Sequence, residues 1–490
     1  MLQALPIEDN MKFTGQFLNE VEQFRIHQES LHILADVGVK FHGEKALPLL
    51  AKNGAKIDWE NKIAHIPKGL VDETLQSTPK SFVLGARNPA YNYPMPSPVS
   101  RFSIDGTAAF VLDFETEQKR YGTLRDIENS LRVFQQMDLG LMAWAPTVAS
   151  DKPADSRVLH EFFGIMRYTS KHGEHEVHYP EQVPYLVEGM KAVLGSEEAI
   201  CTSKAYSMIY CPVAPLMHDG PMLDAYLELG KWNLPVMILP MPVTGTTGPA
   251  SLFSNLALAN AEALSSIVIY QLETPGRPMI YSSAVGSVDF RNGAYLAGTP
   301  EMGIQSAAFV KMGQYYGIPS ASAGCSSDAK EPGAEAILDK LITTIPPVCA
   351  GADIIIGTGE IEGDQLLILE QLIVDNEMCH LCERLYAGVD SSESKDLYED
   401  IAKVGPGGHF LGSRNTRRAS RSDEFFMSSL IDRHPYESWM ELGKPNMYRT
   451  ARQKVEEILA APVVDPLPES VSRKLDEILL IADKELAESV

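Results

Sequence analysis

From about residue 138, short apolar runs rich in β-branched residues alternate with stretches of helical spacing. Each run ends in a loop that contains glycine, proline or polar residues. Continuous apolar strands separated by helices are typical of a parallel sheet buried on both faces. The runs are 139–145, 172–179, 205–210, 235–240, 278–282, 319–323 and 352–356.

The number of these units predicts a closed barrel. Seven strand-helix units, with an eighth strand expected at 407–411, match the eight units of a TIM (β/α)8 barrel. A doubly wound open sheet is the alternative. No GxGxxG motif opens a helix after any of the runs, so a dinucleotide-binding fold has no positive support.

The segments on either side of the barrel have a different pattern of apolar and polar residues. Residues 16–38 have apolar positions at helical spacing and end at Gly38, a plausible C-cap. Short alternating stretches and the proline-rich 92–98 follow, so residues 1–125 are interpreted as an N-terminal α+β extension. The barrel is assigned to 126–447. Residues 448–490 are charged and predict C-terminal helices separated by prolines. The fold class expected is therefore α/β.

Charge and cysteine content narrow the function classes. The formal net charge is −23, from 65 acidic and 42 basic residues. Such a surface repels phosphate backbones and anionic lipids, so we expect no nucleic acid and no membrane partner. No secretory signal and no run of ~18 apolar residues is found, and six cysteines do not form a disulfide framework. We expect a cytoplasmic protein that forms a homo-oligomer.

Polar residues gather in the loops that follow the predicted strands. In a parallel barrel these loops build the active site. They are 241–249 (MPVTGTTGP), 287–293 (SVDFRNG), 324–330 (GCSSDAK) and 357–365 (GTGEIEGDQ). A tight turn that lets a helix pack on the barrel is the alternative for 241–249. The clustering of polar groups at one end of the barrel indicates an enzyme.

No familiar catalytic or metal motif accompanies these loops. Cys379 and Cys382 form a CxxC, but it lies inside the helical run 366–386 without a second ligand pair, so buried structural thiols are expected. His172, His175 and His178 lie three residues apart on one predicted strand and cannot all face one side. We therefore predict no metal. GxSxG, HExxH and P-loop motifs are absent.

Together, several short segments resemble the trimethylamine methyltransferase family, whose members transfer a methyl group from methylated amines to the cobalt of a small corrinoid protein. The likeness extends from about residue 100 to 450. The segments are 244–249 (TGTTGP), 260–262 (NAE), 275–281 (PGRPMIY), 289–293 (DFRNG), 298–301 (GTPE), 315–319 (YYGIP), 327–330 (SDAK), 351–353 (GAD), 375–377 (DNE), 408–412 (GHFLG) and 436–439 (YESW).

Two departures from the family pattern bear on the substrate. Members that act on trimethylamine carry pyrrolysine shortly after the Ser-Asp-x-Lys element, whereas 331–336 here reads EPGAEA. This departure argues against trimethylamine. The resemblance then implies the pyrrolysine-free branch, which acts on glycine betaine and related quaternary amines. Residues 413–416 (SRNT) also stand where many relatives carry histidines.

A quaternary amine explains why acid-base motifs are missing. Its nitrogen leaves as a neutral tertiary amine when cobalt(I) attacks a methyl group, so no general acid is required. The protein must align the cation, exclude water and bind the corrinoid partner. Aromatic faces bind a cation with only ~0.5–2 kcal/mol per ring. Such weak binding stabilises the charged ground state little, so it adds little to the barrier when the charge on nitrogen is lost in the transition state.

The site residues follow from these loops and this chemistry. Core packing is the alternative for each aromatic ring, and Arg414 and Lys204 are alternatives to Arg291 for a substrate carboxylate. The substrate-binding candidates are Trp144, Tyr179, Tyr206, Tyr210, Phe290 and Arg291. The catalytic candidates are Asp328 and Glu360, and the cofactor-binding candidates are Gly245, Thr246, Gly324 and Gly357.

The cofactor expected is cob(I)alamin or a corrinoid carried by a partner protein, with none tightly bound to this chain. Two other functions remain open from the sequence. One is a zinc-dependent thiol methyltransferase that uses Cys325, Cys349 or the Cys379/Cys382 pair. The other is a non-catalytic barrel that binds betaines.

Overall fold

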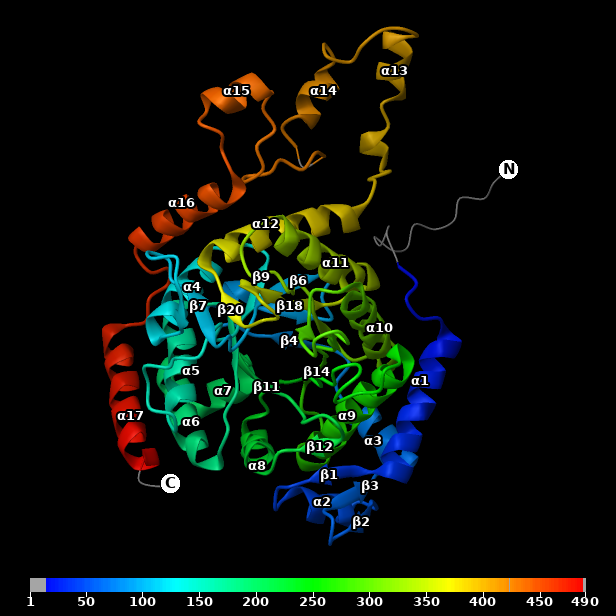
Figure 1. Ribbon diagram of the computed structural model, residues 1–490, viewed down its shortest axis with the longest axis vertical. Helices are drawn as coiled ribbons and strands as arrows, with labels where there is room; N and C mark the ends of the chain where they lie inside the picture. Colours follow the sequence, from blue (N-terminus) through cyan, green and yellow to red (C-terminus); the bar gives the residue numbers. More distant parts are fainter. Residues whose placement is uncertain (1–14, 423, 488–490) are drawn as a thin grey trace.

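Eight parallel strands form a nearly closed barrel in the computed structural model, which describes residues 15–422 and 424–487 (Figure 1). A parallel bridge between Tyr281 and Ser320 connects the two end strands of the sheet. The structure confirms the predicted α/β barrel. In sheet order the strands are β14 (Met279–Tyr281), β13 (Val236–Ile238), β11 (Tyr206–Tyr210), β10 (His172–His175), β9 (Gly140–Ala143), β6 (Arg101–Ile104), β18 (Ile354–Thr358) and β17 (Ala321–Ala323).

The seven predicted apolar runs are all barrel strands, but the predicted eighth strand is wrong. Residues 407–411 form an exposed loop without strand structure. The missing strand is β6, which pairs with β18 and β9 and lies inside the segment assigned to the N-terminal extension. The barrel therefore begins before residue 126. β6 was missed because it is only four residues long and two of them, Arg101 and Ser103, are polar.

Helices surround the barrel and pack on the outer side chains of its strands (Figure 1). Tyr206 contacts Phe162 of α5, and Tyr210 contacts Tyr270 of α9, so these tyrosines face the helix layer. Because side chains alternate along a strand, Ser207 faces the barrel axis. The helices are α4 (Leu124–Gln135), α5 (Arg157–Tyr168), α6 (Val183–Leu194), α7 (Glu197–Ser203), α8 (Gly220–Glu228), α9 (Leu252–Glu273), α10 (Pro300–Tyr316), α11 (Ala334–Ala350) and α12 (Leu369–Ala387).

The part of the N-terminal extension around Gly85 covers the amino-terminal ends of two barrel strands. The backbone N–H of Gly85 donates to the carbonyl of Lys204, just before β11, and the Gly85 carbonyl contacts His172 Nδ1 at 2.7 Å. This leaves the carboxyl-terminal end for a site. The elements are α1 (Glu20–His32), which continues as a π-helix to Val37, β1 (Val39–Phe41), α2 (Ala46–Lys52), β2 (Lys56–Asp58), β3 (Ile63–His65), α3 (Lys68–Ser77), β4 (Phe82–Leu84) and β5 (Tyr93–Met95). β1 pairs with β12 (Met217–His218), which lies in the loop between β11 and α8, so this part of the extension packs on the carboxyl-terminal side of β11.

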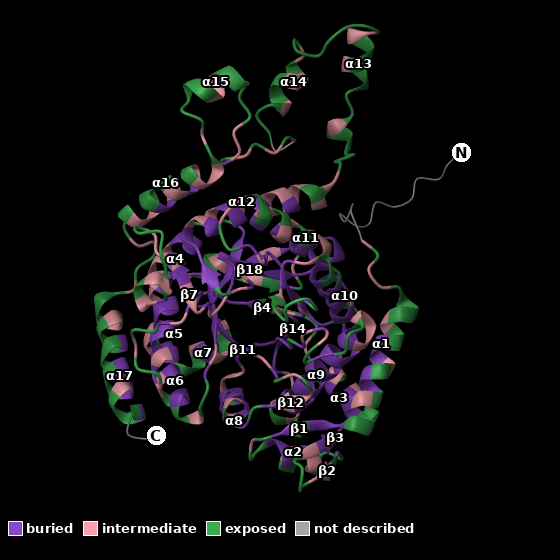
Figure 2. Ribbon diagram, in the orientation of Figure 1, coloured by how far each residue is buried: buried purple, intermediate pink, exposed green. Residues whose placement is uncertain are grey.

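One helix, α9, is long and apolar enough to cross a membrane by length and composition alone. Most of its apolar window, 83 %, is buried inside the protein, where it packs against the barrel and the N-terminal extension. Figure 2 shows the barrel and its inner helices as the buried part of the molecule. α9 is therefore interpreted as a helix of the protein core.

Small sheets add structure to the loops at the carboxyl-terminal end of the barrel. β7 (Phe110–Leu112) and β8 (Lys119–Tyr121) join β19 (Glu360–Ile361) and β20 (Leu366–Leu367) in one four-stranded sheet. A second pair, β15 (Ser287–Val288) and β16 (Tyr295–Leu296), forms a hairpin after β14. Loop residues that are paired in sheets hold their side chains in defined directions.

The C-terminal helices lie on the outside of the barrel. α16 (Met447–Ala460) packs on α12 and α4, and α17 (Glu469–Ala487) packs on α6 and α5. They are the two helices predicted from the charged, proline-interrupted sequence. Between α12 and α16, residues 388–446 project from the body with α13 (Tyr398–Val404), α14 (Arg414–Ala419) and α15 (Tyr436–Glu441) (Figure 1). We call residues 388–446 the arm.

Candidate active site

Three carboxyl groups meet where β6 and β18 end. Asp105 directly follows β6, and its backbone N–H donates to the carbonyl of Thr358, the last residue of β18. Glu360 opens β19, two residues beyond β18, and is fully buried. Asp364 lies in the tight turn between β19 and β20 with a positive φ of 62°. Neighbouring strands therefore bring together acids that are far apart in the sequence.

Burial and mutual repulsion keep these carboxyl groups partly protonated. Burial raises the pKa of Asp105 to about 6 and, together with the charge of Asp105, the pKa of Asp364 to about 8. Burial also raises the pKa of Glu360 well above its usual value, and the neighbouring Asp105 and Asp364 raise it further. The cluster thus carries less than its full negative charge while it is empty.

Glu360 is a buried acid without a hydrogen-bond partner. Within the described chain, neither of its carboxyl oxygens makes a hydrogen bond of normal geometry, and Oδ1 of Asp364 also lacks one. A contact with the backbone of Ala108, too distorted to be a normal hydrogen bond, lowers the pKa of Glu360. Its effect is smaller than those of burial, Asp105 and Asp364, which raise that pKa. An unsatisfied buried polar group costs ~1–3 kcal/mol, and native structures retain few of them. We infer that Glu360 is arranged to receive a ligand.

An indole ring lies beside the acids. A Cβ atom added at Gly106 would lie 2.0 Å from the ring of Trp144, so only glycine lets the ring lie against this backbone next to Asp105. Trp144 Nε1 donates to His175 Nδ1 at 3.2 Å, and His175 Nε2 lies 3.0 Å from Glu161. This pairing selects the tautomer with hydrogen on Nε2 and fixes the ring of Trp144.

A tyrosine from the β15–β16 hairpin, Tyr295, also lies near the cluster. Burial raises the pKa of Tyr295 well above its usual value, and Asp364, Asp328 and Asp105 raise it further. Its ring contacts the backbone of Gly286 and lies 3.4 Å from the position of a Cβ atom at Gly363. Tyr295 as a whole is 41 % exposed, so part of the residue reaches the surface.

Asp328 fixes the hairpin that carries Tyr295. Its two oxygens accept backbone hydrogen bonds from Ala297 and Gly298, at 2.8 and 2.9 Å. Because both oxygens are engaged, Asp328 acts as a positioning group for the loop in this arrangement. A catalytic role for Asp328 stays a prediction.

A buried ion pair lies next to the acid cluster. Lys340 Nζ is 3.0 Å from Asp375 Oδ2. It also donates to the carbonyl of Cys325, in the loop after β17, and to the carbonyl of Gly357, in β18. Asp375 accepts from the backbone of Gly359 at 2.8 Å. The charge of Lys340 lowers the pKa of Asp105, Glu360 and Asp364, which opposes the effect of their burial.

Further acids line the barrel axis along β10. Glu174 accepts a hydrogen bond from Ser207 at 2.7 Å, and burial raises its pKa to about 8. Glu176 follows two residues later. Its burial would raise its pKa, but the hydrogen bond from His178 and the nearby His175 lower it. The carboxyl-terminal end of the barrel is therefore rich in carboxyl groups over several neighbouring strands.

Comparison with known proteins identifies the family. The sequence profile of the family described as trimethylamine methyltransferase (MTTB) matches residues 3–486. A trimethylamine methyltransferase MttB from Methanosarcina thermophila is 32% identical over 470 residues, covering 94% of this chain and 95% of that protein. The chain belongs to the trimethylamine methyltransferase family. It is a methyltransferase of this family, as its resemblance in the sequence predicts.

Two further relatives extend the comparison. A glycine betaine methyltransferase from Desulfitobacterium hafniense strain Y51 is 28% identical over 473 residues, covering 96% of this chain and 98% of that protein. Among solved structures, the monomethylamine methyltransferase MtmB of Methanosarcina barkeri superposes with a TM-score of 0.50 at 13% identity, covering 91% of this chain and 90% of that one. The latter likeness shows a shared fold.

Two of the predicted substrate rings are in the wrong place. Tyr206 and Tyr210 are buried between the barrel and its outer helices, and the hydroxyl of Tyr210 lies 2.8 Å from His218 Nδ1. They face away from the barrel axis, so they cannot form a cage at its mouth. The apolar runs do not show which side faces inward, because both faces of these strands are buried.

The other predicted substrate residues lie at the carboxyl-terminal end of the barrel, and among them only Trp144 is next to the acids. Tyr179 and Phe290 are exposed in the loops after β10 and β14. Arg291 is 88 % exposed, and Asp289 binds its guanidinium at 2.7 Å. The alternatives for a carboxylate lie elsewhere: Lys204 precedes β11 at the amino-terminal end of the barrel, and Arg414 is in the arm.

The predicted cofactor-binding glycines have local reasons to be glycine. A Cβ atom at Gly357 would lie 1.8 Å from the carbonyl oxygen of Gly324, so these two glycines let β17 and β18 approach each other. Gly245 has a φ of 97° and lies against the ring of Phe290. Thr246, beside it, is exposed. Their contact with a corrinoid stays a prediction.

The cysteines of the CxxC pack in the apolar interior. Cys379, Cys382 and Cys325 share one cluster with Phe102 and Ile355. Burial raises the pKa of Cys379 and Cys382 well above the usual thiol value, which opposes formation of the reactive thiolate. In the described residues, no group of three or more His, Cys, Asp or Glu side chains is placed to hold a metal ion.

Sequence reasoning missed Asp105, Asp364, Tyr295 and Lys340 as members of this site. Asp364 falls in the polar loop after the seventh predicted strand, so that loop was a usable signal. Asp105 was hidden because β6 was not recognised as a barrel strand. Tyr295 and Lys340 have no sequence signal, since they reach the site through a hairpin and a helix whose packing only the fold defines.

Proposed function

We propose that this methyltransferase moves a methyl group from a quaternary amine, with glycine betaine as the first candidate, to the cobalt(I) of a corrinoid on a partner protein. The observation that carries the proposal is the unpartnered, fully buried Glu360 among Asp105 and Asp364 at the open end of the barrel. Trp144 and Tyr295 add two aromatic rings. A cation is the ligand that this combination favours.

The site's charge adjusts to the cation. While it is empty, the raised pKa values keep part of the cluster neutral. A bound ammonium favours the carboxylate forms, and the displaced protons leave to solvent. The ring of Trp144, held by His175, adds a cation–π attraction of ~0.5–2 kcal/mol. The sequence led us to expect a mainly aromatic cage; we now propose one with both rings and carboxyl groups.

The transfer itself requires no proton donor. A cobalt(I) corrinoid on the partner would supply the electron pair for the new bond to the methyl carbon. The electron pair of the broken C–N bond stays on nitrogen, and the amine leaves neutral. The residues of this chain hold the cation in line and exclude water. Glu360 binds the positive nitrogen and no step requires it to transfer a proton to the substrate.

Exposed apolar residues around the barrel mouth support a partner that docks there. They lie in the loops after four consecutive strands of the sheet, β10, β11, β13 and β14. The residues are Tyr179, Val213, Met241 and Phe290. Exposed apolar side chains that surround a site mark an interaction surface. We propose that the corrinoid protein covers the mouth through these residues and so brings its methyl acceptor to the bound amine.

The relative named for glycine betaine supports a quaternary amine, whereas the relatives named for trimethylamine act on a tertiary amine by name. The relatives named for trimethylamine are 29–32% identical to this chain, and the relative named for glycine betaine is 28% identical. The ordinary residues at 331–336, where the trimethylamine branch carries pyrrolysine, favour the glycine betaine branch. The six unpaired cysteines suit a reducing compartment, so we place the reaction in the cytoplasm.

Product analysis tests the proposal. We expect purified protein, incubated with cob(I)alamin and glycine betaine, to form methylcobalamin and dimethylglycine in equal amounts. A panel of choline, carnitine and tetramethylammonium identifies the preferred amine if glycine betaine reacts slowly. Binding of these amines without any methylcobalamin would overturn the proposal and indicate a betaine-binding barrel. Activity that requires stoichiometric bound zinc and uses a thiol as the methyl acceptor would overturn the proposal in favour of a thiol methyltransferase.

Cation binding is expected to release protons at neutral pH. Between pH 6 and 8, set by the pKa values of Asp105 and Asp364, the folded empty site keeps protons that a bound cation displaces. The affinity for tetramethylammonium should therefore rise with pH, by up to about tenfold per unit for each proton released, and level off above this range. Isothermal titration calorimetry in two buffers of different ionisation enthalpy measures the protons. A buffer-independent enthalpy at pH 7 would contradict this prediction.

A further inference from the structure

Glu174 is a second buried acid with an unsatisfied oxygen, and it lies on the barrel axis. Its Oε2 atom is 2.7 Å from the hydroxyl of Ser207, which faces the same axis. Within the described chain, its Oε1 atom has no hydrogen-bond partner, although the residue is fully buried in β10. Because native structures leave few buried polar atoms unsatisfied, Oε1 is suited to contact a ligand.

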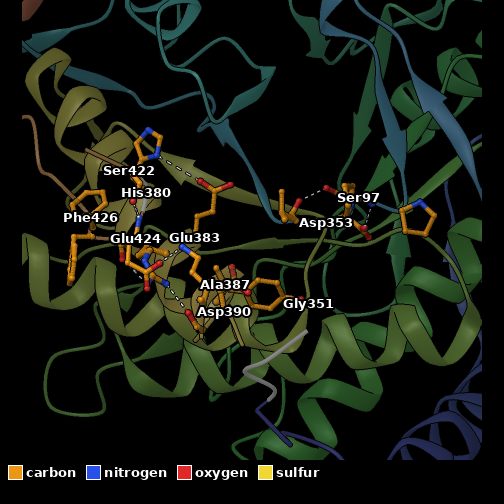
Figure 3. A pocket seen from close by; sticks show the side chains of 18 of the residues that line it. Ser97, Gly351, Asp353, His380, Glu383, Ala387, Asp390, Ser422, Glu424 and Phe426 are labelled. Atoms are coloured by element: carbon orange, nitrogen blue, oxygen red, sulfur yellow. Dashed lines mark hydrogen bonds and ion pairs between the residues drawn. The ribbon is translucent and has the colours of Figure 1, made fainter. Parts of the chain in front are cut away.

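Acids in a groove at the base of the arm show the contrast (Figure 3). This groove lies at the amino-terminal ends of β6 and β18. Figure 3 shows Asp353 beside Ser97, whose backbone N–H donates to it, and Glu383 near His380. Oε2 of Glu383 is 3.8 Å from Nδ1 of His380. These two acids are engaged within the chain, whereas Oε1 of Glu174 has no such partner among the described residues.

A chain of three hydrogen bonds defines where the proton of this acid lies. His172 Nδ1 is 2.7 Å from the carbonyl oxygen of Gly85, which can only accept, so Nδ1 carries a hydrogen. Nε2 of the same ring is 2.7 Å from the hydroxyl of Ser207. In a neutral imidazole this second nitrogen is an acceptor. Ser207 therefore donates its single hydrogen to His172 and has none left for Glu174.

Glu174 must then be protonated and donate to Ser207. The 2.7 Å contact, which an ionised Glu174 would accept, is donated by the acid in this state. The alternative is a protonated His172 with an ionised Glu174. Burial opposes both of these charges, because it lowers the pKa of His172 to about 4 and raises the pKa of Glu174 to about 8. Oε1 is thus the carbonyl oxygen of a neutral acid.

The register of the barrel strands brings Glu174 next to Trp144, the ring proposed to bind the cation. β10 and β9 are parallel neighbours, with Gly173 opposite Ala143. Glu174 and Trp144 come next along their chains, and neighbouring strands lie ~4.8 Å apart. His175, directly after Glu174, accepts from Nε1 of Trp144 at 3.2 Å. The same end of β10 therefore provides both the support of the ring and the acid.

We propose that Glu174 contacts the quaternary ammonium as a neutral acid, with its Oε1 atom against the methyl groups, and that Ser207 and His172 keep it protonated. This inference rests on the proposed function, because it assigns one more contact of the same cation. A carbonyl oxygen attracts the polarised methyl hydrogens only weakly. It therefore orients the methyl groups without a full negative charge, which would stabilise the charged ground state.

Two substitutions at Glu174 distinguish a neutral acid from a carboxylate. E174Q keeps a carbonyl oxygen and an amide that donates to Ser207, so its kcat/KM for the amine should stay within about threefold of the wild type. E174L removes the oxygen at similar size and should lower kcat/KM by roughly tenfold. A loss in E174Q as large as that in E174L would show that the charge of Glu174 is required and would overturn the proposal. A wild-type kcat/KM in E174L would also overturn it.

Infrared difference spectroscopy of the full chain tests the protonation state independently of activity. At pH 7 the wild type should show the carbonyl band of a protonated carboxyl group that E174Q lacks. Tetramethylammonium, once bound, should shift this band without abolishing it, because the proton stays on Glu174. E176Q is the matched control, since Glu176 lies two residues further along the same side. Burial of Glu176 is outweighed by the hydrogen bond from His178, which lowers its pKa, so E176Q should lose no such band.

The spectra also separate this inference from the proposed function. S207A removes the hydrogen-bond acceptor of the acid, so it should shift the band in the empty protein. A band that is missing in the wild type, unshifted in S207A, or abolished or unshifted by bound tetramethylammonium would overturn the assignment of Glu174, even if methyl transfer is normal. A wild type that forms no methylcobalamin from any quaternary amine would overturn the proposed function, whatever the spectra show for Glu174.

Discussion

Replacement of Lys340 with methionine is expected to cost roughly 3–5 kcal/mol of the free energy of unfolding. Lys340 and Asp375 are fully buried, and their ion pair measures 3.0 Å. The variant leaves the carboxylate of Asp375 without its counter-charge. It also removes the donor that joins the carbonyls of Cys325 and Gly357.

Urea denaturation followed by circular dichroism measures this effect as a lower midpoint. The variant K474M, at an exposed lysine paired with Glu477, is the control and should change the free energy by less than ~1 kcal/mol. The double variant K340M/D375N should be more stable than K340M, because it removes the uncompensated charge. A K340M midpoint equal to that of the wild type would show that the pair contributes little.

Replacement of Glu360 with glutamine is expected to lower kcat/KM for the quaternary amine by roughly 30- to 100-fold, equivalent to ~2–3 kcal/mol. Glutamine keeps the size of the side chain but cannot become anionic when the cation binds. The loss should fall mainly on binding, since in the proposed function Glu360 contacts the cation in the ground state and transfers no proton. The melting temperature should not fall, because a neutral amide removes a buried acid that burial disfavours.

A neighbouring glutamate provides the matched control. Glu362 lies in the same loop, but its carboxylate is paired with Lys119 at the surface. The variant E362Q should change kcat/KM by less than about twofold, in keeping with the small energies of exposed pairs. Equal losses in E360Q and E362Q would mean that the total negative charge of the loop, and not the buried carboxyl of Glu360, determines substrate binding.

The strands of the barrel were predictable because burial on both faces produces continuous apolar runs. The same property hid which side chains point inward, so Tyr206 and Tyr210 were placed in the site although they contact α5 and α9. β6 escaped detection because four residues with two polar side chains carry no such run. The error in β6 displaced the expected start of the barrel and concealed Asp105.

The loops of the site were predictable in position but not in detail. Glu360 and Trp144 were selected because they follow strands; in the structure Glu360 is a member of the acid cluster and Trp144 lies beside Asp105. Their neighbours Tyr295 and Lys340 come from a hairpin and from α11, and only the packed fold brings them near. The arm was invisible in the sequence, where its helices fell within the span assigned to the barrel.

The comparison of glycine betaine with trimethylamine tests most directly whether this site is built for a nitrogen with a permanent charge. The rate of methylcobalamin formation from cob(I)alamin is measured for both amines with the same enzyme. A buried acid cluster and a site without a proton donor predict a kcat/KM at least ~100-fold higher for glycine betaine, or for the best tetra-substituted amine found. A higher kcat/KM for trimethylamine than for every tetra-substituted amine would contradict the proposed chemistry.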